Sequence, residues 1–293
     1  MSERALPQTP ARRAFPTHGW VGLVLVSVFW SLNWSLDGLR THWTFFPLWL
    51  GYCLAVDALV FFRKGTSLFT RSWRKYIGLF LVSAPVWWTF EIVNWRLNNW
   101  HYDGGELFTP FLFWIWATLN FTTVIPAVLG SAELIASFNF LKRVGRGPVI
   151  RPDKRTSLIF FSAGWLMFIA MFTWPNLFFP FIWLSIFFII EPINVWLGDR
   201  SLTDWTRKGD WRPVFALWLG VLMTAFFWEM WNFFSYPKWI YHVPWGGCCK
   251  IFEMPLLGYG GYLPFALEIF AMYHLVAGLL GDKRTEYVQI APE

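Results

Sequence analysis

Long apolar runs separated by short polar segments form the dominant pattern of this chain. A helix that crosses the hydrocarbon core of a membrane needs about 20 consecutive, mostly apolar residues. Runs of that length predict an all-α polytopic membrane protein with about eight transmembrane helices. These helices are expected at residues 19–36, 44–62, 76–95, 107–131, 157–174, 178–197, 213–234 and 251–279. Only a short turn at Trp174-Pro175-Asn176 joins the fifth and sixth runs, so this pair is alternatively a hairpin that dips into the bilayer.

The polar segments divide the chain into two membrane units. Residues 1–18, rich in Pro, Arg and Ala, predict a disordered cytoplasmic lead, and the first apolar run is too long for a cleavable signal. We place the first membrane repeat at residues 19–140 and the second at residues 157–281. A basic linker at 141–156 joins them, and a cytoplasmic tail follows at 282–293.

Basic residues are distributed unevenly between the two predicted sides of the membrane. The side that carries both chain ends holds 20 of the 24 Lys and Arg residues. Because basic loops are retained in the cytoplasm, both termini are predicted to be cytoplasmic, in what we expect to be a bacterial inner membrane. The net charge of +6 follows from this asymmetry and from contact with anionic lipid. The expected partner is the lipid bilayer, and nucleic-acid binding has no support.

An acid and an amide occur together twice, each time near the end of an apolar run. The first copy is Phe90-Glu91-Ile92-Val93-Asn94-Trp95 followed by Trp100-His101-Tyr102, and the second is Trp228-Glu229-Met230-Trp231-Asn232-Phe233 followed by Trp239-Ile240-Tyr241. Residues three apart share one face of a helix, so each copy places Glu and Asn side by side. An ionisable group inside a membrane span costs roughly 2.5–3.5 kcal/mol on insertion scales. We therefore interpret Glu91, Asn94, Glu229 and Asn232 as candidate catalytic residues.

Other features recur with the same spacing, and they predict two parallel four-helix repeats. Phe46-Pro47 and Phe179-Pro180 open the second and sixth spans, and Asp57 and Glu191 follow in them. Four spans per unit give both units the same orientation, related by a pseudo-twofold axis along the membrane normal. We therefore expect the third and seventh spans to be neighbours, with their glutamates facing a shared central space. The alternative for each acid is a polar clamp between helices, which contributes only about 0.6–2 kcal/mol in membranes.

Aromatic residues surround both acids within one helical turn. The chain has 23 Trp, 32 Phe and 9 Tyr residues. Aromatic faces stabilise cations by roughly 0.5–2 kcal/mol each, and Trp is the best of them. An acid in a dry aromatic chamber suits proton-initiated carbocation chemistry, because such an acid is able to donate a proton. The candidate substrate-binding residues are Trp87, Trp88, Trp228, Trp231, Tyr259 and Tyr262.

Three further acids lie inside predicted spans. Glu268 lies mid-span behind Pro264 and is a third candidate catalytic residue by its position. Asp57 and Glu191 either take part in function or reach out to basic residues of the nearby cytoplasmic loops. The five His residues are scattered, and the sequence has no nucleotide fingerprint or glycine-rich phosphate loop, so neither a metal nor a cofactor is expected.

These motifs resemble those of the small lycopene cyclase domain of carotenoid pathways. Trp228-Glu229 followed by Trp239-Ile240-Tyr241 looks like that family's Trp-acid motif, and Phe90-Glu91 with Trp100-His101-Tyr102 is similar. The segment from Leu263 to Phe270 is similar to its Pro-x-Glu-Glu motif, but here a single acid, Glu268, stands at shifted spacing. The resemblance implies an intramembrane fold that handles isoprenoids. It extends more faintly to the membrane-embedded terpene cyclases.

The sequence therefore predicts a cofactor-free intramembrane cyclase or isomerase that acts on a long apolar isoprenoid or carotenoid-like lipid. Glu91, Glu229 or Glu268 would supply the acid and the base. One alternative is a proton- or ion-coupled transporter of a small molecule or lipid, in which the repeats rock around the same acids. Another is a non-catalytic membrane scaffold subunit, in which the motifs are structural clamps.

Overall fold

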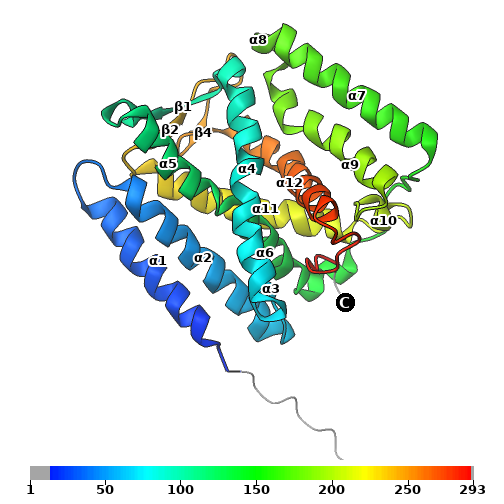
Figure 1. The fold of residues 1–293 in the computed structure, drawn as a ribbon, viewed down its shortest axis with the longest axis horizontal. Helices are drawn as coiled ribbons and strands as arrows, with labels where there is room; N and C mark the ends of the chain where they lie inside the picture. The colour runs from blue at the N-terminus through cyan, green and yellow to red at the C-terminus, as the bar shows by residue number, and fades with distance from the viewer. Residues whose placement is uncertain (1–13, 292–293) are drawn as a thin grey trace, which may run out of the picture.

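The computed structural model describes residues 14–291, which form a bundle of helices (Figure 1). The longer helices are α1 (Thr17–Ser35), α2 (Thr41–Lys64), α4 (Trp73–Leu97), α5 (Pro110–Phe121), α6 (Val124–Ala136), α7 (Lys154–Thr173), α9 (Ser185–Leu197), α11 (Arg212–Phe233) and α12 (Tyr259–Leu279). Short helical segments are α3 (Leu68–Arg71), η1 (Gly105–Leu107), η2 (Asn139–Arg143), α8 (Pro175–Phe178), η3 (Phe179–Trp183), α10 (Thr203–Thr206) and η4 (Leu256–Gly258). The strands are β1 (Trp100–Asp103), β2 (Lys238–Tyr241), β3 (Lys250–Ile251) and β4 (Met254–Pro255).

Six segments of the described chain are long and apolar enough to cross a membrane. A seventh is reached when α8 with η3 and α9, which meet at a bend of 42°, are counted as one broken span. The chain is thus a multi-pass, all-α membrane protein, as predicted, but the count falls one or two short of the expected eight. The missing span is α1, a helix of 19 residues in which polar residues such as His18 and Asn33 reduce the apolar character.

The expected fourth and sixth spans are interrupted helices. The fourth consists of α5 and α6, which meet at Thr122 and Thr123. The sixth is the bent segment from Pro175 to Leu197, which is either a broken span or a re-entrant loop. The hairpin alternative at Trp174-Pro175-Asn176 therefore stays open. Most of the predicted lead at residues 1–18 lies outside the described residues, and Thr17 and His18 already belong to α1.

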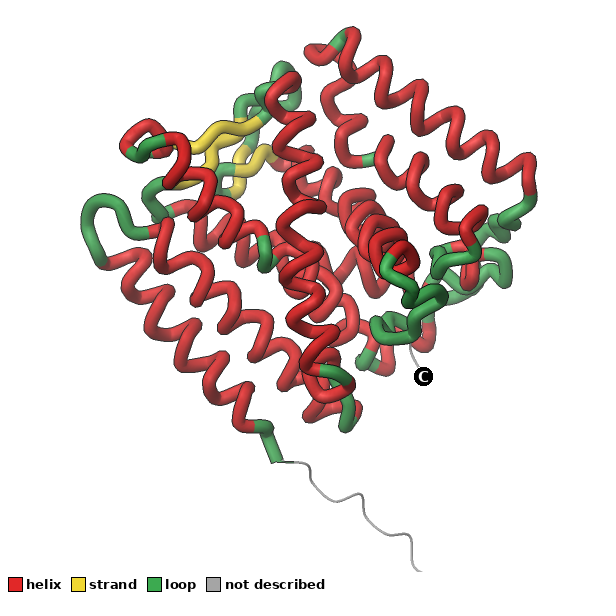
Figure 2. The backbone as a smooth tube through the Cα atoms, viewed as in Figure 1, coloured by secondary structure: helices red, strands yellow, loops and turns green. Residues whose placement is uncertain are grey.

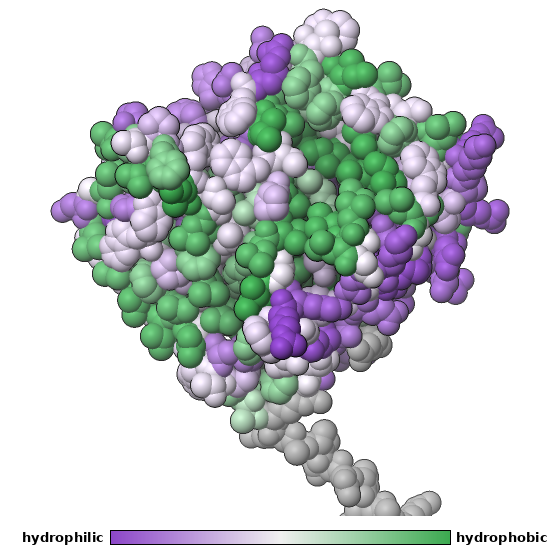
Figure 3. All heavy atoms as spheres, viewed as in Figure 1, coloured by the Kyte–Doolittle hydropathy of each residue, from purple (hydrophilic) through white to green (hydrophobic). Residues whose placement is uncertain are grey.

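The connections gather at two opposite ends of the bundle, and the strands lie together at one of them (Figure 2). At this strand end, Arg40 donates a hydrogen bond of 2.7 Å to the carbonyl of Phe234. At the other end, the amide of Gly147 donates to the carbonyl of Gly209 at 3.0 Å. The loops thus sort into the two sets expected from the sequence. Figure 3 shows a broad apolar surface, with hydrophilic residues gathered around the C-terminal segment and along one edge.

The C-terminal segment is folded against the end opposite the strands. Tyr287 and Ile290 are buried, with 6% and 0% of their surface exposed. The Tyr287 hydroxyl donates to the carbonyl of Leu68 at 2.8 Å, and the amide of Gln289 donates to the Glu133 carboxyl at 2.6 Å. The predicted tail at 282–293 is therefore, as far as residue 291, a packed element of the fold.

Two acids at this same end hold the turns that follow their helices. Asp57 in α2 accepts hydrogen bonds from the Ser67 hydroxyl at 2.6 Å and from the Phe69 amide at 2.9 Å. Glu191 in α9 accepts from the Thr203 amide at 3.1 Å. Both acids therefore fix the next segment of the chain from inside the protein.

The two glutamate-bearing helices are joined through other helices. Both α4 and α11 pack against α6 and against α12. A Cβ atom on Gly220 of α11 would lie 2.5 Å from the backbone nitrogen of Ala132 in α6, so glycine permits this close crossing. We expected α4 and α11 to be direct neighbours at a central axis. The structure corrects this, because α6 occupies the face of α11 around Gly220.

Candidate functional site

The two aromatic segments that follow the Glu–Asn motifs pair with each other as antiparallel strands. In this pair Trp100 lies opposite Tyr241, and Tyr102 lies opposite Trp239. Antiparallel pairing has local twofold symmetry, and this register exchanges the two Trp-x-Tyr segments. The strand pair therefore brings the partners of both glutamates to one place between the two halves of the chain.

The two asparagines of the motifs hold these strands in position. Asn94 donates to the carbonyl of Trp100 at 2.8 Å, and its side-chain oxygen accepts from the Asn99 amide at 2.8 Å. Asn232 donates to the carbonyl of Trp239 at 2.8 Å and accepts from its amide at 3.0 Å. Each asparagine thus binds the backbone of its own strand, which satisfies polar groups that leave the helix end.

Glu91 is buried, with 1% of its surface exposed, and one carboxyl oxygen accepts three hydrogen bonds. The donors are the indole nitrogens of Trp87 at 2.9 Å and Trp100 at 3.1 Å, and the hydroxyl of Tyr102 at 2.6 Å. Trp87 comes from the same helix, one turn earlier, whereas the other two come from β1. The motif and its strand thus build one acid site.

Glu229 is fully buried and has a similar setting in the second half. Its Oε1 accepts from the hydroxyls of Tyr241 at 2.8 Å and Tyr262 at 2.6 Å. Trp239 donates in turn to the Tyr241 hydroxyl at 3.0 Å. The second carboxyl oxygen, Oε2, is buried and has no partner among the described residues. Hydroxyls and indole N–H groups therefore hold both acids in place of basic residues.

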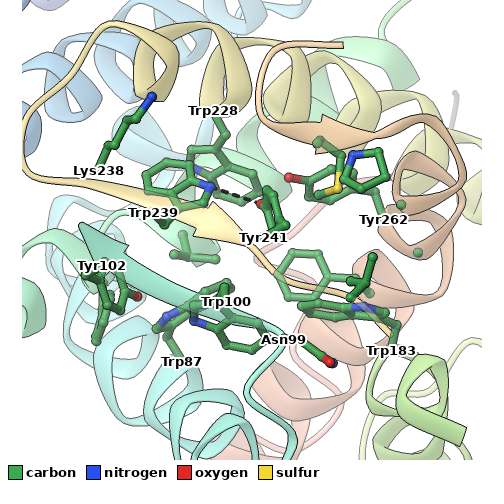
Figure 4. Close-up of a pocket in the computed structure, with 18 of the residues that line it drawn as sticks. Trp87, Asn99, Trp100, Tyr102, Trp183, Trp228, Lys238, Trp239, Tyr241 and Tyr262 are labelled. Atoms are coloured by element: carbon green, nitrogen blue, oxygen red, sulfur yellow. Dashed lines mark hydrogen bonds between the residues drawn. The ribbon is translucent and has the colours of Figure 1, made fainter. Parts of the chain in front are cut away.

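The donors to both glutamates line one cavity of about 560 Å³ (Figure 4). Trp87, Trp100 and Tyr102 come from the Glu91 site, and Tyr241 and Tyr262 come from the Glu229 site. Further aromatic walls are Phe45, Phe113, Trp116, Phe121, Trp183, Trp228, Trp239 and Phe265. The volume lies in the range of small-molecule sites, and so does the predominance of apolar lining. The expected shared space therefore exists, and each glutamate is linked to it through its ring partners.

The tyrosines on the two strands stay protonated. Burial, followed by the neighbouring Glu91 carboxyl, raises the pKa of the Tyr102 hydroxyl well above its usual range. Burial and Glu229 raise the pKa of Tyr241 in the same way. Each hydroxyl is therefore a neutral donor at physiological pH, and each lies between an acid and the cavity.

The predicted ring residues divide into two groups. Trp87, Trp228 and Tyr262 line the cavity. Trp88 instead donates to the Thr118 hydroxyl at 3.1 Å and packs on Trp114. The other two also lie outside the lining: Trp231 is buried among aromatic rings, and the Tyr259 hydroxyl donates to the carbonyl of Ile251.

Glu268 lies outside the cavity lining. It is fully buried, and its Oε1 accepts from the Phe187 amide at 3.4 Å, in the first turn of α9. A carboxylate at a helix N-terminus is stabilised by the exposed amides and the helix dipole. This contact joins α12 to α9 directly below Trp183 and Leu184, which do line the cavity.

The sequence-based selection missed several cavity residues. Trp183 reaches the cavity from η3 and stacks on Trp100, with ring centroids 5.8 Å apart. Asn99 lines the cavity immediately before β1. The recurring Trp-x-Tyr segments were the available signal for Trp100, Tyr102, Trp239 and Tyr241, whereas nothing in the sequence singled out Trp183.

Comparisons with protein families, with curated proteins and with solved structures found no match. Within residues 14–291, no group of three or more His, Cys, Asp and Glu side chains is placed to hold a metal ion.

Proposed function

We propose that this protein is an intramembrane cyclase or isomerase that uses an acid to start a reaction of a long apolar isoprenoid. The observation that carries the proposal is the shared cavity. Two buried glutamates are linked to it by tyrosines and tryptophans that form its walls. A dry aromatic space next to an acid can both protonate a carbon–carbon double bond and stabilise the resulting cation.

The chemistry needs only proton movements. A proton leaves one glutamate through its tyrosine hydroxyl and forms a new C–H bond at an alkene carbon. The other alkene carbon becomes cationic and is either shifted along the chain or attacked by a second double bond, which closes a ring. Loss of a proton from a neighbouring carbon to the second glutamate restores an alkene. The product is an isomer of the substrate, so no oxidant or reductant is consumed.

The repeat architecture supports this division of labour. We propose that the two halves are parallel repeats related by a twofold axis through the β1–β2 pair. The equivalent contacts of Asn94 and Asn232 support this, as do the equivalent contacts of Asp57 and Glu191. Such a repeat would give one site two acids at equal depth. The motif resemblance to the lycopene cyclase domain also favours an isoprenoid, although Glu268 stands alone in place of that family's paired glutamates.

Lipid extraction tests the proposal most directly. Extracts are compared from isoprenoid-producing cells that express wild-type protein, a Glu91→Gln/Glu229→Gln double variant, or Glu106→Gln, in which the exposed Glu106 serves as a matched control. We expect an isoprenoid of unchanged mass but altered chromatographic retention with the wild-type protein and the control only. Identical extracts from all three strains would contradict the proposal.

One observation favours a carrier as the second candidate. The bent segment formed by η3 and α9 places Phe179, Trp183 and Leu184 in the cavity wall. Transporters commonly build their binding sites from interrupted helices. In that case the same extracts would be unchanged, while uptake or release of the ligand would depend on the gene.

A further inference from the structure

The cavity has polar side chains that the two acid sites do not use. Tyr102, Tyr241 and Tyr262 are hydrogen-bonded to the glutamates. His42 and Asn120 also line the cavity, yet neither side chain has a hydrogen-bond partner among the described residues. Asn99 is the third such residue, with 3% of its surface exposed.

Asn99 is held in place entirely by its backbone. Its amide donates to Asn94 at 2.8 Å, and its carbonyl accepts from the His242 amide at 2.7 Å. The side-chain amide is therefore left for another partner. Figure 4 shows it beside Trp183, at the edge of the aromatic wall. An amide offers one donor group and one acceptor, which is what a hydroxyl group needs.

His42 and Asn120 form a second polar position. The ring of His42 packs on Trp116, with centroids 5.2 Å apart. Trp116 and Asn120 are one turn apart in α5, so they share a face of that helix. An imidazole and an amide thus lie on one wall of the cavity.

Unpartnered polar groups in a buried, mainly aromatic space are costly. A buried donor or acceptor without a partner costs about 1–3 kcal/mol, and native proteins contain few of them. A cavity made for a pure hydrocarbon gains nothing from three such side chains. A ligand with a hydroxyl group would satisfy one of the two positions while its chain lies against the rings.

We propose that the ligand of this cavity is an isoprenoid alcohol rather than an isoprenoid hydrocarbon, with its hydroxyl bound by Asn99 or by the His42–Asn120 pair. This inference rests on the proposed isoprenoid-binding function. A site that hydrogen-bonds a substrate hydroxyl discriminates strongly against the analogue that lacks it. The preference for the alcohol is therefore the measurable property.

The test uses farnesol and farnesene, which share a C15 chain and differ in the hydroxyl. Binding to the full chain in detergent micelles is followed by quenching of tryptophan fluorescence, since several tryptophans line the cavity. We expect farnesol to bind about tenfold more tightly, or better, than farnesene, corresponding to one hydrogen-bonding group satisfied. Asn99→Leu or Asn120→Leu should reduce this preference about tenfold, whereas Asn139→Leu, at an exposed position, should leave it unchanged.

Two measurements keep the result interpretable. Thermal unfolding confirms that each variant is folded, and Asn99→Gln, which keeps an amide, should retain part of the preference. Equal binding of both ligands to the wild-type protein would overturn this inference and leave the proposed function intact. An alcohol preference that survives both leucine substitutions would also overturn it. Binding of neither ligand would count against the inference and the proposed function together.

Discussion

Trp100 lies directly opposite Tyr241 in the antiparallel pair of β1 and β2. Trp100 donates a hydrogen bond to Glu91, and Tyr241 donates one to Glu229. One strand register therefore connects two acids that are 138 residues apart in the sequence. A shift of this register by one residue would turn both side chains to the opposite face of the strands. The strand pair is thus a positioning element for both acid sites.

The acids themselves are expected to matter for function more than for stability. Glutamine retains hydrogen-bond acceptance and removes an expensive ionisable group from the membrane, so Glu91→Gln and Glu229→Gln should unfold near the wild-type temperature. An amide cannot supply a proton, so at least one variant should lose activity by a factor of about 10²–10⁴. Thermal unfolding in detergent and product formation are measured on the same samples. Full activity in both variants would make the two acids structural.

The ring walls should act mainly in the transition state. A ring that stabilises a cation contributes little while the substrate is neutral. Trp228→Leu is therefore expected to lower kcat and to leave KM near the wild-type value. Trp88→Leu is the matched control, since Trp88 lies outside the cavity. If Trp228→Leu raises KM alone, the ring contributes to substrate binding and the cation role is wrong.

The asparagines of the motifs should behave as structural residues. Asn94 and Asn232 bind the backbone of β1 and β2 through two or more hydrogen bonds each. Asn94→Ala and Asn232→Ala should each destabilise the protein by about 1–3 kcal/mol, because buried backbone groups lose their partners. Asn139→Ala, at an exposed site, should change stability by less than about 0.5 kcal/mol. Unchanged stability with lost activity would restore the catalytic role that the sequence suggested.

The sequence identified the acids well but could not place all of their neighbours. Spacing within one helix is local information, so Glu91 with Trp87, and Glu229 near Trp228, could be recognised directly. Trp88 follows Trp87 by one residue and therefore points about 100° away around the helix, into a separate cluster with Trp114.

The residues that complete the cavity depend on tertiary packing. Trp183 reaches Trp100 only because η3 bends the chain beside α12. The role of Asn94 was missed because its partners lie in a strand that forms only by pairing with β2. The span count was too high because α1 follows the membrane length rule but contains His18 and Asn33, and Asn33 accepts hydrogen bonds from Thr41 and Thr44.

The C-terminal segment should be required for stability. Ile290 is fully buried, and Arg71 forms an ion pair with Glu133, the same acid that accepts from the Gln289 amide. Ile290→Ala should cost about 2–5 kcal/mol, as in other buried large-to-small substitutions. Glu286→Ala is the control, because its side chain is 82% exposed and its ion pair is worth little. Equal unfolding temperatures of both variants would show that the segment is not part of the cooperative fold.

The orientation of the bundle is open to direct measurement. The loops sort into two ends, and 20 of the 24 basic residues belong to the end that carries the linker and the tail. Because basic loops are retained in the cytoplasm, reporter fusions after residues 70, 150, 205 and 290 should read cytoplasmic, and fusions after residues 103 and 245 should read external. A fusion after residue 38 tests α1 separately. His18 contacts Asp57 at one end of this helix, at 3.1 Å, and Arg40 contacts Phe234 just beyond the other. The helix therefore runs the length of α2, and its far end should read external despite its lower apolar content. An external reading at any of the first four positions would contradict the orientation, and a cytoplasmic reading at residue 38 would remove α1 from the spans.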